Sequence, residues 1–386
     1  MTTTKNNEHK KLNVPNLRFP EFEGEWVSKT IGDIAPLQRG FDLPTRQICN
    51  GKIPVVYSNG IMNHHSSYKC VAPGLVTGRS GTIGKFTYIE DGYYWPHNTS
   101  LWVTDFHDNN PKFIYYLYQT IHIEQYSTGS GVPTLNRNNV HRHKTFIPKL
   151  KEQNKIAAFL SLLDERISTQ SKIIDKLQSL IKGLNDFLYT QYGGEVLTSF
   201  AELGTSYSGL SGKSAQDFGS GKPFITYLNV YSNNVIKEND FQYVAIKDDE
   251  KQNVVKYGDV LFTLSSETPE EVGVGSVYLG KEKVYLNSFC FGIHITNTEV
   301  AFPPYLSYYV SLTAFRKFIY PYAQGSTRFN LCKADFEKAS IKLPTLADQK
   351  RIYSVLGHID CKIETERQML NLYNSQKQYL LRQMFI

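Results

Sequence analysis

The segment FIPKLKEQNKIAAFLSLLDERI, residues 146–167, occurs in this chain a second time in altered form. The second copy is KLPTLADQKRIYSVLGHIDCKI, residues 342–363, and it aligns with the first without a gap at a constant offset of 196 positions. A segment that recurs at a fixed offset indicates an internal duplication of a structural unit. The identical pairs are Pro148 and Pro344, Leu150 and Leu346, Gln153 and Gln349, Ile156 and Ile352, Leu160 and Leu356, Asp164 and Asp360, and Ile167 and Ile363.

Both copies continue into a long run with apolar residues at alternating steps of four and three. This spacing is typical of the a and d positions of a coiled coil. A proline precedes each run, and Glu152 or Asp348 stands in its first turn, where the helix dipole favours negative charge. The predicted interface positions are Ile156, Leu160, Leu163, Ile167, Gln170, Ile174, Leu177 and Ile181 in the first helix, and Ile352, Leu356, Ile359, Ile363, Glu366 and Leu370 in the second.

Two packing arrangements are compatible with these runs. Each helix could pack only on its own neighbouring domain, or the two could pair as an antiparallel coiled coil. We favour the pair, because the heptad phase persists through the first copy and returns in the second. The polar residues Gln170 and Glu366 then occupy equivalent seam positions, where a polar side chain can set the register.

The stretches before the two helices read differently from them. Short β-type runs, such as 53–57 and 260–264, alternate with Gly, Asn and Asp turns, and an aromatic helix-like segment follows in each stretch. We therefore expect a mixed α+β fold of two β-rich lobes joined by two long antiparallel helices, with an internal pseudo-twofold relation. The predicted boundaries are a disordered tail at 1–14, a first lobe at 15–150, a helix at 151–193, a second lobe at 194–346 and a helix at 347–386.

The composition limits the function classes. The chain has 386 residues, a net charge of +6 and 41% hydrophobic residues, which predicts an ordinary globular protein with at least two domains. Its mild positive charge is compatible with a polyanionic partner. The five cysteines show no CxxC spacing, so we expect reduced thiols, and no stretch is apolar for long enough to cross a bilayer. These features favour the cytoplasm.

Two equivalent units in one chain tend to be related by an approximate twofold axis. Antiparallel helices would then hold the lobes at a fixed separation, and duplex DNA has matching dyad symmetry. Proteins of this symmetry read two half-sites about 34 Å apart. Because the lobes differ in sequence, the half-sites should differ as well.

This arrangement resembles the specificity subunit of type I restriction-modification systems (the HsdS family) over essentially the whole chain. The motifs that carry the resemblance are VPNLRFPEFEGEWVSKTIGDI at 14–34, GVPTLNRNNV at 131–140 and the paired P-x-L-x-[ED]-Q segments at 148–153 and 344–349. The second copy departs from the pattern at 329–336, where FNLCKADF replaces TLNRNNV.

The resemblance implies that the lobes are target recognition domains and that the helices set their spacing. It implies a non-catalytic, DNA-associated subunit in the bacterial cytoplasm that directs N6-adenine methylation and restriction to a split target. The expected partners are double-stranded DNA, two modification (methyltransferase) subunits and restriction/translocase subunits. No cofactor or metal is expected in this chain, and S-adenosylmethionine, ATP and magnesium are expected on the partner subunits.

Motifs that would give the chain its own chemistry are incomplete. FPPY at 302–305 resembles an amino-methyltransferase motif, but its first position must accept hydrogen bonds and Phe302 cannot. GKS at 212–214 lacks the earlier glycine of a phosphate-binding loop. The paired histidines at 64–65 and 141–143 have no carboxylate or thiol at ligand spacing, so solvated surface is the favoured interpretation.

DNA-contacting residues must therefore come from the lobes. Base readout needs donors and acceptors that project into a groove, and other polar groups contact phosphates. The candidates in polar or Gly-flanked stretches are Arg39, Lys52, Asn59, Arg79, Ser80, Lys85, Asn98 and Arg137 in the first lobe, and Lys213, Lys222, Tyr227, Asn229, Ser265, Ser266, Asn287 and Arg328 in the second.

Two alternatives stay open from the sequence. One is a self-contained DNA methyltransferase or endonuclease, which catalysis by the purified chain would reveal. The other is a coiled-coil interaction protein that does not bind DNA. It would lack the steep salt dependence that phosphate contacts give to DNA binding.

Overall fold

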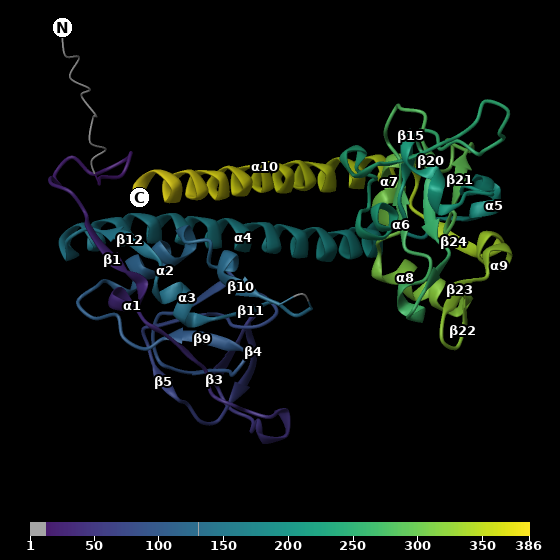
Figure 1. Cartoon of the computed structure of the whole chain (residues 1–386). Helices are drawn as coiled ribbons and strands as arrows, with labels where there is room; N and C mark the ends of the chain where they lie inside the picture. Colours follow the sequence, from purple (N-terminus) through teal and green to yellow (C-terminus); the bar gives the residue numbers. More distant parts are fainter. Residues whose placement is uncertain (1–12, 130) are drawn as a thin grey trace, which may run out of the picture. The chain divides into compact units, whose positions relative to one another are not determined.

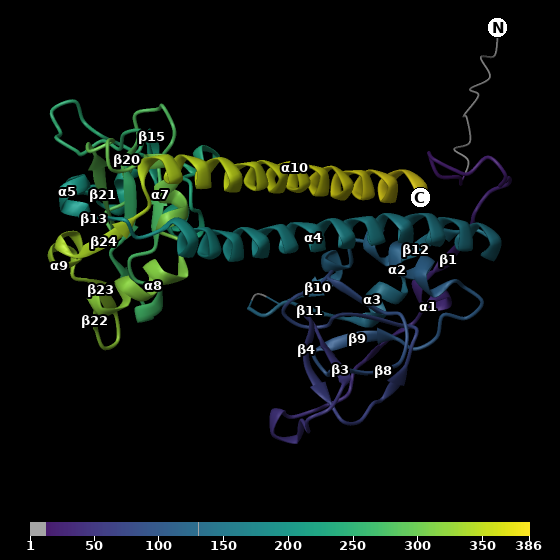
Figure 2. The ribbon, with the colours of Figure 1, turned by 180° about the vertical axis from the view of Figure 1, so that it is seen from behind.

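The computed structural model describes residues 13–129 and 131–386 (Figures 1 and 2). Of the tail expected at 1–14, residues 1–12 lie outside this described part. The chain divides into two compact units. The first contains the chain up to Ser171 together with Gln368–Ile386, and the second contains Lys172–Arg367. Each unit therefore holds one lobe and part of both long helices.

The first lobe is built from short strands with three helices (Figure 1). The strands are β1 (Val27–Thr30), β2 (Leu37–Arg39), β3 (Ile53–Tyr57), β4 (Gly60–His65), β5 (Cys70–Val71), β6 (Gly74–Gly78), β7 (Phe86–Ile89), β8 (Tyr93–Pro96), β9 (Ser100–Val103), β10 (Ser127–Thr128), β11 (Thr134–Leu135) and β12 (Lys144–Ile147). The helices are α1 (Ile31–Ile34), α2 (Pro111–Thr120) and α3 (Arg137–His141).

The second lobe has a similar set of elements. The strands are β13 (Val196–Ser199), β14 (Gly204–Ser208), β15 (Phe218–Ile225), β16 (Gln242–Val244), β17 (Val260–Thr263), β18 (Ser265–Ser266), β19 (Gly275–Val277), β20 (Tyr285–Leu286), β21 (Cys290–Ile295), β22 (Ala323–Gly325), β23 (Phe329–Leu331) and β24 (Ser340–Leu343). The helices are α5 (Phe200–Leu203), α6 (Tyr227–Ser232), α7 (Pro303–Tyr309), α8 (Thr313–Ile319) and α9 (Lys333–Lys338).

The two lobes have similar sheet topologies. An antiparallel four-stranded sheet has the order β2-β9-β6-β7 in the first lobe and β14-β21-β17-β19 in the second. A second sheet is β4-β3-β8-β5 in one and β16-β15-β20 in the other, and each contains one parallel pair, β3 with β8 and β15 with β20. The lobes therefore share a fold that their divergent sequences conceal.

Each lobe is closed at its base by its first and last strands. Strand β1 pairs with β12 in the register Val27↔Ile147, and β13 pairs with β24 in the register Val196↔Leu343. A four-residue helix follows the first strand in both lobes, with a side chain as its cap. The Asp33 carboxylate accepts from the Thr30 amide, and the Ser199 hydroxyl accepts from the Glu202 amide. Such capping satisfies amides that the short helix leaves unpaired.

The expected long helices are α4 (Leu150–Tyr192, 43 residues) and α10 (Leu346–Met384, 39 residues). Each begins two residues after Pro148 or Pro344. This start is expected, because a proline disfavours helical conformation in the residue before it. The mixed α+β class expected from the sequence is confirmed.

In the first unit, the beginning of α4 packs against the end of α10. Ile156, Leu160 and Leu163 share one buried core with Leu380 and Met384. Asp164 pairs with Lys377 at 2.7 Å, and the Arg166 guanidinium lies 5.8 Å from the Tyr373 ring centroid. The later residue of α4 faces the earlier residue of α10, so the helix segments of this unit are antiparallel.

The second unit contains the other segments of the two helices. Ile181 of α4 is buried, as are Ile352, Leu356 and Ile363 of α10. The Arg351 guanidinium lies 5.6 Å from the ring centroid of Tyr192. The heptad positions thus face inward in this unit too.

The aromatic helix-like segment expected in the second lobe forms two helices, α7 and α8, with a break between them. Two consecutive residues of α4 stabilise the break. Asn185 donates from Nδ2 to the Tyr308 carbonyl at 2.9 Å, and the Asp186 carboxylate accepts from the amide and hydroxyl of Thr313 at 2.9 and 2.7 Å. These bonds satisfy backbone groups at the end of α7 and the start of α8.

Candidate nucleic-acid interface

One edge of each lobe is assembled from loops that are far apart in sequence. In the first lobe, the Arg79 amide donates to the Thr99 carbonyl at 2.9 Å, and the Leu135 amide donates to the Arg79 carbonyl at 2.7 Å. In the second lobe, the same two bonds join Leu264 to Phe289 at 2.9 Å and Leu331 to Leu264 at 2.8 Å. Arg79 is therefore equivalent to Leu264, and Thr99 to Phe289.

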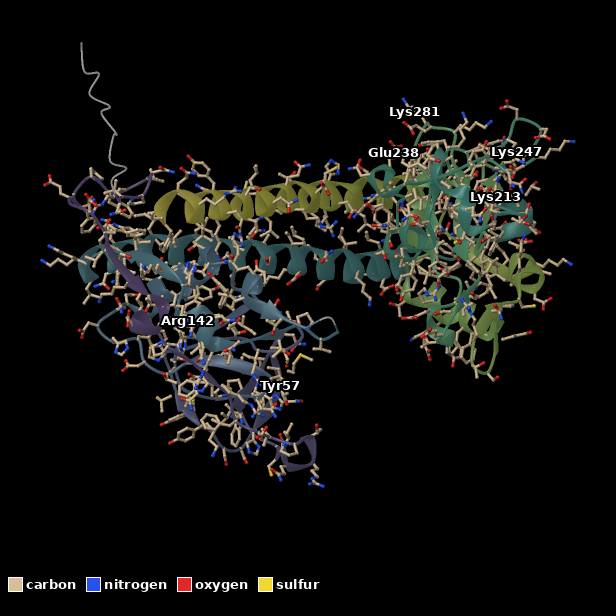
Figure 3. All side chains as sticks on the ribbon, in the orientation of Figure 1. Tyr57, Arg142, Lys213, Glu238, Lys247 and Lys281 are labelled. Carbon is tan, nitrogen blue, oxygen red and sulfur yellow. The ribbon has the colours of Figure 1, made fainter. Side chains whose placement is uncertain are left out.

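The edge of the first lobe carries a polar cluster. Arg39 pairs with Asp42 at 3.1 Å, and both side chains are more than half exposed. Asn98 donates to the same Asp42 carboxylate. Next to this cluster, the ring of Tyr57, labelled in Figure 3, lies tilted against His97 with 4.1 Å between the ring centroids. Amide, carboxylate and guanidinium groups held in one place have the chemistry of base readout.

Arg79 and Ser80 are further candidates of the first lobe that lie on this edge. Both residues directly follow strand β6, and Ser80 forms an isolated bridge with Thr134 of the β10–β11 hairpin. Lys85 donates to the Asn59 carbonyl at 2.6 Å, which joins two further loops. Lys52 is exposed just before β3, and Arg137 is exposed at the start of α3.

In the second lobe, the candidate Asn287 accepts from the Phe289 amide at 2.9 Å and so shapes the loop before β21. Phe289 is 55% exposed. The guanidinium of Arg328, at the tip of the β22–β23 hairpin, lies 5.8 Å from the Phe289 ring centroid. Lys222 is exposed on β15.

Several candidates of the second lobe are already engaged within it. Lys213, labelled in Figure 3, is 8% exposed at its side chain and pairs with Glu250. Asn229 is buried and donates to the Lys237 carbonyl at 2.8 Å. Tyr227 donates to the Ser265 carbonyl at 2.8 Å, and Ser265 and Ser266 are both buried. These side chains hold the loops in place, so readout is better assigned to their exposed neighbours.

The two edges present different chemistry on the same framework. The first lobe has Arg79 and Thr99 where the second has Leu264 and Phe289. On the hairpin, the offset of the repeat places Val132 of the first lobe opposite Arg328 of the second. Arg79 of the first lobe and Arg328 of the second therefore lie on loops that are not equivalent.

Each lobe is anchored to its long helix by a buried glutamine. Gln153 accepts from the Asn110 amide at 2.9 Å and donates to the Pro148 carbonyl at 3.0 Å. Gln349 accepts from the Phe302 amide at 2.8 Å and donates to the Pro344 carbonyl at 2.9 Å. The repeated glutamine thus has the same structural role twice.

In the first unit, the residue before Gln153 also forms hydrogen bonds with another part of the unit. Arg18 forms two hydrogen bonds of 2.8 Å with the buried Glu152 carboxylate, and the Trp26 indole donates to it at 3.2 Å. Arg18 and Trp26 both belong to the segment at residues 14–34. In the same segment, the amide of Leu17 donates to the Gln383 carbonyl at 2.9 Å. This segment therefore ties the start of α4 to the end of α10 in the first unit.

A tyrosine and an aspartate repeat in the same way. Tyr116 donates to Asp164 at 2.8 Å in the first unit, and Tyr308 donates to Asp360 in the second. Asp164 is joined by Lys377, whereas the position 196 residues before Lys377 is Ile181. The two junctions are thus similar but not identical.

Most predicted seam residues are buried, and Ile167, Leu177, Ile359 and Leu370 are partly buried. The sequence reasoning missed a second apolar stripe, one position before the seam, which is exposed on both helices. The signal was present as apolar residues in excess of a strict a/d pattern. In the first unit it comprises Phe159, Leu162, Met369, Leu372 and Tyr379, and in the second Ile173, Leu180, Phe187 and Val355.

A buried polar network lies beside β17 in the second lobe. Asp259 is 2% exposed and accepts from Tyr207 at 2.7 Å and from the Lys256 amide at 2.8 Å, with His294 Nδ1 at 2.8 Å. Burial raises the pKa of the Asp259 carboxyl, although these hydrogen bonds oppose the rise. The network lies inside the lobe and has a structural role.

Within residues 13–129 and 131–386, no group of three or more His, Cys, Asp or Glu side chains is placed to hold a metal ion. None of the helices in that part of the chain is long and apolar enough to span a membrane.

Comparison with known proteins identifies the family. The family model for the type I restriction modification DNA specificity domain matches the chain twice, at residues 23–179 and 204–372, and the chain belongs to this family. A putative type I restriction enzyme MjaX specificity subunit from Methanocaldococcus jannaschii is 28% identical over 61% of this chain and 56% of its own length. The Escherichia coli type I restriction enzyme EcoprrI specificity subunit is 24% identical over 38% of each chain. The chain thus spans about half or less of these curated relatives.

Solved structures support the fold. The crystal structure of a type I restriction-modification system S subunit from M. genitalium matches with a TM-score of 0.57 at 14% identity, covering 97% of this chain and 99% of that one. A chain from a structural study of complex assembly and conformational transition of the type I R-M system matches with a TM-score of 0.54 at 15% identity, covering 92% and 96%.

Proposed function

We propose that this chain is the DNA specificity subunit of a type I restriction-modification complex and that each lobe reads one half of a bipartite, asymmetric target. The observation that carries the proposal is the pair of equivalent lobe edges. The same backbone hydrogen bonds hold both edges, while the exposed side chains on them differ. A duplicated framework with changed contact residues suits two related readers of two different sequences.

The long helices set the distance between the half-sites and dock two adenine-N6 methyltransferase subunits. The exposed apolar stripe supports the docking, because exposed apolar patches of this kind mark protein interfaces. Its repetition supports two copies of one partner. Phe159 and Val355 are related by the 196-residue offset, as are Ile173 and Met369.

The chain itself contributes recognition and assembly, and the chemistry belongs to its partners. S-adenosylmethionine, ATP and magnesium bind the modification and restriction/translocase subunits in this proposal. The incomplete methyltransferase motif at 302–305 is consistent with it, because Phe302 uses its backbone amide to hold Gln349 and has no side-chain acceptor for a target amine.

The experiment is a methylome of the native host, by single-molecule sequencing, with and without this gene. Loss of N6-methyladenine from one asymmetric split motif is the expected result, and it supplies both half-sites. If every motif persists, purification of the chain with candidate modification subunits and a target-selection binding assay decides the matter. Binding without any sequence preference would overturn the proposal.

A further inference from the structure

Phe289 is an exposed aromatic residue on the edge of the second lobe. Its amide is fixed by Asn287 Oδ1 at 2.9 Å and its carbonyl by the Leu264 amide at 2.9 Å, so the loop holds the ring outward. The residue is 55% exposed, although an exposed phenyl ring gains nothing from water. The ring is therefore available for contact with an apolar group of a ligand.

Arg328 stands directly beside this ring. Its guanidinium lies 5.8 Å from the Phe289 centroid, within the range of a cation–π contact. The hairpin that carries Arg328 is tightly closed. Gly325 has a φ of +148°, and a Cβ there would meet the Arg328 carbonyl oxygen at 2.1 Å. The guanidinium is therefore presented next to the ring from a constrained turn.

The equivalent positions of the first lobe hold different residues. Thr99 replaces Phe289 in the equivalent backbone hydrogen bond, and Val132 replaces Arg328 at the repeat offset. The pair is thus not repeated at the equivalent positions of the first lobe, as expected of residues that distinguish one half-site from the other.

The chemistry of the two side chains selects particular bases. Arginine donates two hydrogen bonds to O6 and N7 of guanine, and phenylalanine contacts the 5-methyl group of thymine. Side chains in mutual contact reach neighbouring base pairs. Resting on the proposed function, we infer that Phe289 and Arg328 together read a thymine beside a guanine in the half-site bound by the second lobe.

The test uses the full chain in complex with its modification subunits and duplexes that carry the methylome-derived target. Each thymine of the second half-site is replaced in turn by deoxyuridine, which removes only the methyl group, and each guanine by 7-deazaguanine, which removes N7. One deoxyuridine should weaken binding of the unaltered protein about fourfold, from the loss of one apolar methyl contact. One adjacent 7-deazaguanine should weaken it by about tenfold.

Two single variants separate the contributions of the two side chains. Phe289→Ala should abolish the deoxyuridine penalty and keep the 7-deazaguanine penalty, and Arg328→Ala should do the reverse. Phe218→Ala, at a ring that is 41% exposed on β15, is the matched control and should keep both penalties. The inference would be overturned if each base replacement weakened binding equally in the unaltered protein and in all variants. It would also be overturned if Phe289→Ala weakened binding equally on thymine and on deoxyuridine duplexes. Failure of the unaltered protein to prefer its target would count against the proposed function instead.

Discussion

Gln349 and Phe302 are joined by a hydrogen bond of 2.8 Å from the Phe302 amide to the Gln349 side-chain oxygen. The bond has a counterpart in the first unit, where Asn110 donates to Gln153 at 2.9 Å. Both glutamines are almost fully buried, at 0% and 2% exposure. They fix each lobe to the start of its long helix within its unit.

Gln349→Ala should therefore destabilise the second unit. The change leaves the Phe302 amide and the Val300 and Pro344 carbonyls without their partner. Leaving buried polar groups unsatisfied costs about 1–3 kcal/mol. The expected result is a melting temperature lower by several degrees in a thermal unfolding assay. Gln191→Ala, at an exposed position of α4, is the control, and an equal shift in both variants would contradict the anchor role.

The neighbouring leucines of α4 should separate folding from docking. Leu163 is 7% exposed and Leu162 is 62% exposed. Leu163→Lys should lower the free energy of unfolding by about 2–5 kcal/mol, because a buried leucine is lost and a charge is placed in the core. Leu162→Lys should leave unfolding nearly unchanged and weaken binding of a modification subunit by about tenfold. Calorimetric unfolding and a pull-down titration measure the two effects, and unaltered docking in Leu162→Lys would refute the stripe as a partner surface.

Arg79→Ala should affect only the half-site of the first lobe. Arg79 is held at the edge through its backbone bonds to Thr99 and Leu135, so truncating its side chain should not disturb the loop. Affinity for the target should fall by about tenfold or more, with relaxed preference at one base pair of that half-site. Competition binding with single-base variants measures this change. Arg142→Ala, at the end of α3 (Figure 3), is the control and should keep the preference.

A pH prediction follows from Asp259. Burial raises the pKa of the Asp259 carboxyl in the folded protein above its value of about 3.9 in the unfolded chain. The protonated carboxyl therefore stabilises the fold fully at a pH below the unfolded pKa. This contribution is lost as the pH rises through the pKa of the folded protein. The difference in unfolding free energy between the unaltered protein and Asp259→Asn should therefore fall as the pH rises from about 4 to about 7. Urea unfolding measures the difference.

Asp217 provides the opposite control for that experiment. A hydrogen bond from the Ser214 amide lowers the pKa of the Asp217 carboxyl. The Asp217→Asn difference should not fall over the same pH range. A falling difference for both variants would indicate a general charge effect and would contradict the role given to burial at Asp259.

Lengthening both helices should change the spacing of the target and nothing else in it. Seven residues added after Ser171 in α4 and after Arg367 in α10 keep the heptad phase and add about 10 Å to each helix. At about 3.4 Å per base pair, the gap between half-sites should grow by about three base pairs. Methylome sequencing reads the outcome, and altered half-site bases would disprove the spacer role.

The long helices could be predicted well because their signal is local. The heptads of α4 and α10 repeat over many turns, and prolines at 148 and 344 mark their starts. The common topology of the lobes could not be predicted in the same way. It depends on pairings such as β3 with β8, between residues about forty apart, which leave no pattern in either strand alone.

The candidate site was predictable in its residue types but not in their individual roles. Lys213 is a residue type that commonly contacts phosphate. In the structure it pairs instead with Glu250, which is 37 residues away in sequence. Phe289 attracts no notice as a single phenylalanine in the run LNSFC. Its exposure and its contact with Arg328 exist only because two distant loops meet.

The closed base of each lobe has a consequence for how new specificities arise. Strands β1 and β12 bring the two ends of the first lobe together, and β13 and β24 do the same for the second. The two ends of a lobe are thus adjacent and are joined by the same strand pairing in both lobes. Genetic recombination can therefore exchange the sequence of one lobe and leave the other intact. If each lobe reads one half-site as proposed, independent exchange at two places multiplies the available targets, because every variant of one lobe can combine with every variant of the other.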